Sequence, residues 1–194
     1  MAFLNPLIVR PVPDGYYEII SGHRRKHAAE KLGYRKVPVI IRVLSEDDSI
    51  LSMVDSNLHR ERISYSEKAF AYKLKNDVLK KKKVVEKKSQ VDHKTPRKRS
   101  IDIISEDCGD SPKQVQRYIS LTKLIPEMLQ KLDDEIISFC PAVEIAALKE
   151  NEQRELLKAM DYAQAIPSLS QAQRIKQLSK RKTVVTGKDG RNHV

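Results

Sequence analysis

The first third of the chain alternates short apolar runs with patterns typical of helices. Three runs are rich in β-branched and aromatic residues, at 7–12, 16–20 and 37–41. A Pro-Asp-Gly turn signal at 13–15 joins the first two runs as a hairpin. Helical spacing of apolar positions follows in 23–32, which stops at Gly33, and again in 45–58. The pattern predicts a small α/β unit over residues 1–63.

Beyond that unit the periodicity is helical almost throughout. Ser64 and Glu67 have the spacing of a capping box, and apolar residues recur every four positions behind them. Prolines and charge interrupt the pattern from Lys87 to Ser100, where we expect a mobile connection. The expected segments are an α/β domain, a basic helix and linker, an all-helical domain and a disordered tail, at 1–63, 64–99, 100–182 and 183–194. The fold class expected is α+β.

Charge is concentrated in one part of the chain. The 194 residues hold 37 Lys and Arg against 26 Asp and Glu, a net charge of +11. Residues 73–99 carry 12 basic and 3 acidic side chains, so this segment supplies most of the excess. Such a stretch suits a polyanion, because each neutralised phosphate releases counterions. A solvated helix end followed by a flexible linker remains the alternative.

Several classes of protein do not fit the composition. No apolar run approaches the length of a membrane span, and the N-terminus lacks the layout of a secretory signal. Cys108 and Cys140 form neither a metal-ligand pattern nor a disulfide framework. We therefore expect a cytoplasmic protein with no membrane partner.

Residues 101–121 have the pattern of a helix-turn-helix. Gly109 stands where a tight turn needs positive φ, and Ser111-Pro112 has the residues that begin a helix. Asp110 departs from the pattern, because the residue after the glycine is usually apolar. The second helix is expected to expose the side chains that read DNA, namely Lys113, Gln114, Gln116 and Arg117. An ordinary hairpin of two helices is the alternative.

Two arginine motifs predict an anion site. Ser21-Gly22-His23-Arg24-Arg25 stands where a β run ends and a helix begins, so free amides and two guanidinium groups come together. Asn57-Leu58-His59-Arg60 closes the next helix and adds an arginine with an amide partner. The alternative is that these arginines cap helices or pair with Glu18 and Glu61. No Cys or carboxylate accompanies the histidines at ligand spacing.

These motifs resemble the N-terminal domain of the ParB partition proteins, where they read Gly-Glu-Arg-Arg and Glu-Asn-x-x-Arg. The matching segments are Arg10-Pro11-Val12, 17–25, 37–40 and Asn57-Leu58-His59-Arg60-Glu61. The basic helix and the helix-turn-helix follow in the expected order, so the resemblance covers about residues 7–180.

The resemblance implies a DNA clamp that binds CTP with Mg²⁺. Carried over, the residues on the nucleotide phosphates are Gly22, His23, Arg24, Arg25, Asn57 and Arg60. Asn57 is also the residue carried over to the metal. The implied partners are double-stranded DNA, a second copy of the chain as a dimer on DNA, and a partition ATPase. The implied setting is the bacterial nucleoid or a plasmid, in chromosome, plasmid or mobile-element partition.

The chain departs from the family at two motif positions. His23 replaces the glutamate of the first motif, and Ser56 replaces the glutamate before the asparagine. Mg²⁺ prefers charged oxygen ligands, and Asp55 is one residue out of register. At most a weak CTPase activity is therefore expected.

Two other functions stay open. One is a helix-turn-helix transcriptional regulator with a vestigial nucleotide site. The other is a nucleotide-dependent small-molecule kinase of the ParB and sulfiredoxin superfamily, for which Glu18 is the only nearby base.

Overall fold

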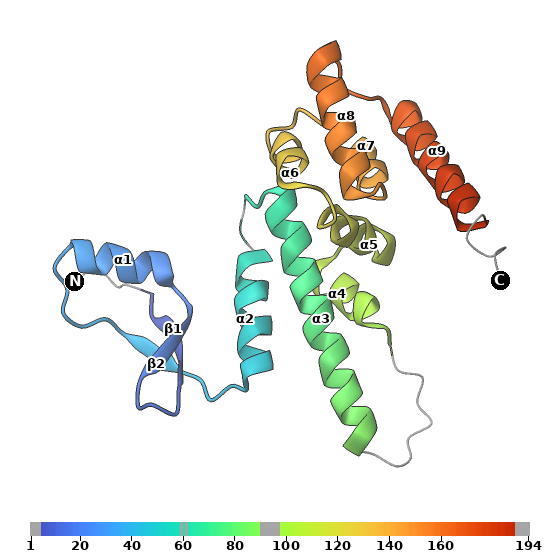
Figure 1. The fold of residues 1–194 in the computed structure, drawn as a ribbon. Helices are drawn as coiled ribbons and strands as arrows, with labels where there is room; N and C mark the ends of the chain where they lie inside the picture. The colour runs from blue at the N-terminus through green and yellow to red at the C-terminus, as the bar shows by residue number, and fades with distance from the viewer. Residues whose placement is uncertain (1–4, 59, 61, 90–97, 189–194) are drawn as a thin grey trace. The chain divides into compact units, whose positions relative to one another are not determined.

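The computed structural model describes residues 5–58, 60, 62–89 and 98–188. The chain divides into two compact units, one from Met1–Arg62 with Leu74–Ser100 and one from Ile63–Lys73 with Ile101–Val194. Figure 1 shows a small sheet and helices in the first unit and only helices in the second. The fold is α+β, as the sequence predicts.

A three-stranded sheet forms the N-terminal part of the first unit. Its strands are β1 (Leu7–Pro11), β2 (Tyr17–Ser21) and β3 (Val39–Ile41), in the spatial order β2-β1-β3. The first two strands form the predicted antiparallel hairpin, whereas β3 lies parallel to β1. A parallel strand requires a crossover connection, and α1 (His23–Lys31) supplies it.

Apolar residues of the strands and helices make the core of this unit. Leu7, Val9 and Ile20 are buried, as are Ala29 of α1 and Val54 of α2 (Glu46–Leu58). The acidic first turn of α2 suits the positive end of the helix dipole. Both predicted helices are confirmed to within a residue or two.

Helix α3 (Tyr65–Ser89) contributes to both units, which meet in sequence at Lys73 and Leu74. Its predicted capping box is confirmed, because Ser64 and Glu67 exchange side-chain hydrogen bonds with each other's backbone amides. The helix runs to Ser89, three residues into the segment where the sequence suggested a mobile connection. The rest of that linker, residues 90–97, lies outside the described residues.

The second unit is all helical. Its helices after α3 are α4 (Ser100–Cys108), α5 (Pro112–Leu121), α6 (Pro126–Asp133), α7 (Phe139–Ile145), α8 (Glu150–Ala163) and α9 (Leu169–Lys188). Leu121, Met128, Leu132 and Ile145 are fully buried in its core. The one buried amide among them, Gln153, is satisfied by the amide of Ile125 and by two backbone carbonyls.

The C-terminal end differs from the sequence prediction. Helix α9 continues to Lys188, whereas the sequence suggested a disordered tail from Thr183. The rest of that tail, 189–194, lies outside the described residues. Among the described helices, none is long and apolar enough to cross a membrane.

Candidate functional site

A cavity of about 450 Å³ lies in the first unit, between the start of α1 and the end of α2. The two arginine motifs, far apart in sequence, meet there. Its lining includes all six residues expected on the phosphates, Gly22, His23, Arg24, Arg25, Asn57 and Arg60. The remaining lining residues are Ile20, Ser21, Met53 and Ser56. We call this cavity the arginine pocket.

Gly22 shapes the entrance to α1. Its φ of 110° lies in the region that favours glycine, and a Cβ built there would stand 2.6 Å from Leu7 Cδ2. The turn lets the chain leave β2 and enter α1 at once. No side chain caps α1, and its first turn holds no acidic residue. The first amides of α1 are therefore available to donate hydrogen bonds to an anion, which the positive end of the helix dipole would also attract.

The arginines of the pocket differ in how they are held. Arg25 is half-buried, and its Nη1 donates to the carbonyl oxygens of Asn5 at 2.8 Å and Pro6 at 2.6 Å. Part of its guanidinium therefore fixes the chain segment that enters β1. Arg24 and Arg60 are exposed. A phosphate ligand in this pocket would draw mainly on these two arginines and on the amides of α1.

The donor set of the pocket suits phosphate better than a protein-held Mg²⁺. Its described lining contains no carboxylate, and Ser21 Oγ lies 3.0 Å from Ser56 Oγ in a hydrogen bond. Asp55, one residue out of register, pairs instead with Lys75 Nζ at 2.6 Å. No group of three or more potential metal-ligating side chains occurs among the described residues. Apart from Asn57, the side-chain oxygens of the described lining are the hydroxyls of Ser21 and Ser56, so the pocket itself does not fit a metal site.

Glu18 does not belong to the pocket. Its Oε2 accepts from Arg10 Nε at 2.5 Å, and its side chain is absent from the described lining. The alternative in which the motif arginines pair with Glu18 is therefore wrong, since Arg10 takes that carboxylate. The other alternative partner, Glu61, and the motif residue His59 lie outside the described residues.

Helix α5 begins as the sequence predicts. Ser111 accepts a hydrogen bond from the amide of Gln114, Pro112 opens the helix, and Gly109 has a φ of 73°. Ile104 of α4 and Val115 of α5 are fully buried. The two helices are therefore joined by a tight turn, and each contributes a fully buried apolar residue.

The four candidate DNA-reading residues of α5 are not equally accessible. Lys113 and Gln116 are exposed, whereas Gln114 and Arg117 are half-buried. Arg117 Nη2 donates to Cys140 Sγ at 3.3 Å, and its guanidinium carbon lies 5.5 Å from the Phe139 ring centre. Packing against α7 therefore engages the guanidinium of Arg117.

Asp110, the residue that departs from the helix-turn-helix pattern, is the centre of a polar cluster. Its Oδ2 accepts from Tyr72 Oη at 2.6 Å and pairs with Lys68 Nζ at 2.8 Å. Burial by itself raises the pKa of Asp110, but the hydrogen bonds from Lys68 and Tyr72 outweigh it and hold that pKa below its usual value. Burial, with the bond to Asp110, also raises the pKa of Tyr72 well above its usual range.

This cluster fixes the turn between α4 and α5 to α3. Lys68 also lies 4.8 Å from the ring centre of Tyr118 on α5, a cation–π contact. The sequence analysis missed Lys68 and Tyr72. The only signal for them was the charge of Asp110, because a buried carboxylate at that position requires hydrogen-bonding partners.

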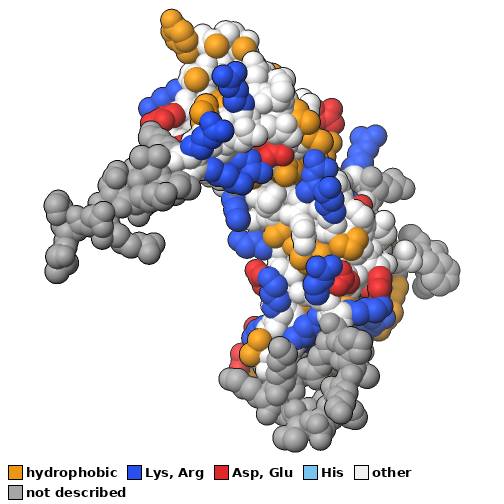
Figure 2. Space-filling model, turned by 90° about the vertical axis from the view of Figure 1, so that its right-hand side faces the viewer, with side chains coloured by type: hydrophobic (Ala, Val, Ile, Leu, Met, Phe, Trp, Pro, Cys, Tyr) orange, Lys and Arg blue, Asp and Glu red, His pale blue; other side chains and the backbone are white. Residues whose placement is uncertain are grey.

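Basic side chains are distributed over the face drawn in Figure 2, with acidic side chains among them. The lysine run 80–83 lies on α3. Within the run, Lys81 and Lys82 each pair with an aspartate of α2, and Lys83 Nζ donates to the carbonyl oxygen of Lys98. The run is therefore partly engaged within the first unit, which neither sequence interpretation anticipated.

The comparisons with known proteins agree with the motifs. A family model for the ParB N-terminal domain matches residues 2–58. Nucleoid occlusion proteins of Bacillus thuringiensis (strain Al Hakam) and Bacillus cereus (strain B4264) are each 44% identical over 69 residues, 36% of this chain and 24% of theirs. The chain thus spans about a quarter of the length of the curated relatives it matches.

A solved structure extends the likeness beyond that domain. It is the C-terminally truncated chromosome-partitioning protein ParB from Caulobacter crescentus, complexed to the centromeric parS site. The match covers 92% of this chain and 83% of that chain, with a TM-score of 0.52 and 24% sequence identity. Residues 2–58 therefore match the model of the ParB N-terminal domain, and the chain as a whole has the fold of that ParB structure.

Proposed function

We propose that this chain is a ParB-like, sequence-specific DNA-binding protein whose action is gated by CTP. The observation that carries the proposal is the arginine pocket, in which both motifs of the ParB N-terminal domain line one cavity of about 450 Å³. Its exposed arginines and the uncapped amides of α1 provide positive charge and donors for a triphosphate. The base preference for cytosine comes from the family resemblance.

The base-specific contacts with double-stranded DNA are assigned to the second unit. The matched Caulobacter protein is complexed to the centromeric parS site, which supports the same class of partner for this chain. Helix α5 would enter the major groove, with Lys113 and Gln116 as its accessible readers and Gln114 and Arg117 beside them. The long amide of Gln116 can pair with an adenine edge, and Lys113 can reach a guanine or a phosphate.

The assembly we propose follows from the same likeness. A dimer on DNA would act in the bacterial cytoplasm in chromosome, plasmid or mobile-element partition, or in nucleoid occlusion like the Bacillus relatives. A partition ATPase is a further proposed partner. Because the pocket lacks a carboxylate, Mg²⁺ would be held by nucleotide phosphates with Asn57, and hydrolysis would be slow or absent.

A regulator with a silent nucleotide site is the second candidate. Two contacts favour it, since Arg25 donates to two backbone carbonyls and Ser21 and Ser56 bond to each other across the pocket. Kinase activity has no comparable support, because Glu18 is paired with Arg10 away from the cavity.

Calorimetric titration with CTP, ATP, GTP and UTP, with and without Mg²⁺, tests the nucleotide proposal. We expect selective binding of CTP that is lost in Arg24→Ala and in Arg60→Ala. Arg174→Ala, an exposed arginine of α9, is the matched control and should bind like the unmodified protein. Absence of binding to all four nucleotides would favour the regulator with a silent site.

A further inference from the structure

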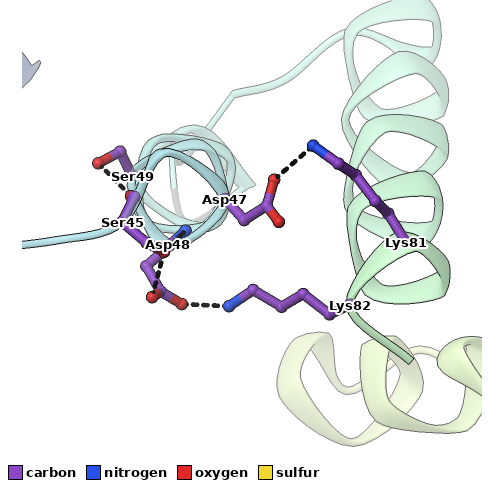
Figure 3. Close-up of polar contacts among 6 residues, drawn as sticks. All are labelled: Ser45, Asp47, Asp48, Ser49, Lys81 and Lys82. Atoms are coloured by element: carbon purple, nitrogen blue, oxygen red, sulfur yellow. Dashed lines mark hydrogen bonds and ion pairs between the residues drawn. The ribbon is translucent and has the colours of Figure 1, made fainter. Parts of the chain in front are cut away.

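Three lysine–aspartate pairs join α2 to the part of α3 that belongs to the same unit. From one end to the other they are Asp55 with Lys75, Asp48 with Lys82, and Asp47 with Lys81. The pairing runs antiparallel, so the acidic first turn of α2 lies beside the lysine run 80–83 (Figure 3). The pair of Asp55 and Lys75 includes the most buried side chain of the six, since the Lys75 side chain is only 3% exposed.

The other two pairs are more accessible, and each joins one exposed side chain to one that is partly buried, Asp47 at 23% and Lys82 at 29% exposure. The Lys81 side chain is 67% exposed and its Nζ lies 3.3 Å from Asp47 Oδ1. The Asp48 side chain is 46% exposed and pairs with Lys82. Both lysines belong to the most basic segment of the chain, where a polyanion would be expected to bind.

Asp48 is held in place by Ser45 at the start of α2. Ser45 Oγ donates to Asp48 Oδ2 at 2.6 Å, and the Asp48 amide donates to Ser45 Oγ, so Ser45 caps the start of α2 (Figure 3). The hydrogen bonds from Lys82 and Ser45 hold the pKa of Asp48 below its usual value, so this carboxylate stays charged at neutral pH. Asp48 is thus preorganised against Lys82, and Asp47 lies beside Lys81.

We propose that Asp47 and Asp48 act as an internal competitor that DNA phosphates must displace from Lys81 and Lys82. The inference rests on the proposed DNA-binding function and adds a regulatory element to it. Competition weakens the sequence-independent part of binding, which comes from phosphate contacts, and leaves the base contacts of α5 unaffected. The ratio of specific to non-specific affinity would therefore rise.

Neutralising the aspartates should strengthen binding to a duplex of arbitrary sequence. Surface pairs contribute modestly, so D47N/D48N is expected to raise that affinity roughly 2- to 30-fold at low salt. Two further phosphate contacts should also steepen the plot of log K against log[salt] by up to about 2. Fluorescence anisotropy with a labelled 20-base-pair duplex measures both quantities.

The lysines provide the matched control. In the K81Q/K82Q background the same aspartate substitutions should leave the affinity for the duplex unchanged, because the aspartates no longer compete with DNA for these two lysines. A general effect of net charge would instead raise affinity equally in both backgrounds, and that result would overturn the inference. D47N alone keeps the Ser45–Asp48 cap and serves if the double variant fails to fold.

The outcomes separate the two proposals. If the unmodified protein binds the duplex but D47N and D47N/D48N bind it no more tightly, the inference fails and DNA binding stands. If no variant binds any duplex at low salt, the proposed DNA-binding function fails and the inference fails with it.

Discussion

Tyr72 Oη donates a 2.6 Å hydrogen bond to Asp110 Oδ2, which joins α3 to the residue after the turn glycine of α4 and α5. The Tyr72 side chain is fully buried, and Lys68 pairs with the same carboxylate oxygen. A charged residue at a usually apolar position of a helix-turn-helix thus has a structural reason. Where an apolar contact of the turn is usual, this chain has a partly buried hydrogen bond to another helix.

Tyr72→Phe should destabilise the second unit. The substitution keeps the ring in the core but removes the donor to a partly buried carboxylate, at an expected cost of about 1–3 kcal/mol in the free energy of unfolding. Urea unfolding followed by circular dichroism measures the change. Tyr162→Phe is the control, because Tyr162 is 93% exposed. Equal stabilities of the two variants would show that the bond contributes nothing.

The Asp110 carboxylate should make stability depend on pH in the acid range. Its pKa in the folded protein lies below the usual 3.8, so its contribution is fully present above that value. The contribution is lost as pH falls through the lower folded-state pKa. Asp110→Asn should therefore flatten the acid side of the stability curve, measured as the midpoint of thermal unfolding between pH 2 and 6.

Asp161→Asn is the control for this pH dependence. Asp161 also pairs with a lysine, Lys131, but its side chain is 60% exposed and the pair is 3.3 Å long. Asp161→Asn should leave the acid side of the stability curve unchanged. If the midpoint of thermal unfolding of Asp110→Asn fell with pH as steeply as that of the unmodified protein, the role assigned to the Asp110 carboxylate would be contradicted.

Gly22→Ala should destabilise the first unit more than Gly33→Ala. Both glycines have positive φ, at 110° and 78°, but only the Cβ at Gly22 would collide with Leu7, whereas at Gly33 nothing lies within 4 Å. We expect a loss of about 2–4 kcal/mol for Gly22→Ala. Gly33→Ala should cost roughly 1–2 kcal/mol. Urea unfolding of both variants checks the difference, and equal losses would show that the contact with Leu7 is unimportant.

Much of the fold could be predicted because its signals are local. The capping box at Ser64 and Glu67, the turn at Gly109 and the start of α5 at Ser111-Pro112 each depend on residues within a few positions of one another. The meeting of the arginine motifs was also predictable, since each stands at the end of an expected element and the resemblance to ParB joins them.

The unpredicted features are tertiary pairs. Asp110 meets a tyrosine 38 positions earlier, and Lys82 meets an aspartate 34 positions earlier. A lysine run reads the same in a sequence whether water or a neighbouring helix surrounds it. Arg117 has helical spacing suited to an exposed face, but the aromatic ring of Phe139 on α7 packs against it. Such contacts depend on how helices pack, which periodicity does not specify.

The burial of Arg117 changes the expected result of mutating α5. Gln116 is exposed, so Gln116→Ala should lower affinity for a selected duplex by about 1–3 kcal/mol with unchanged stability. Arg117→Ala should lower both affinity and stability, because it also removes the contacts with Phe139 and Cys140. Anisotropy with a duplex selected from a random library, together with urea unfolding, separates the two effects. If Gln116→Ala bound the selected duplex and a scrambled one as the unmodified protein does, α5 would not be the reading helix.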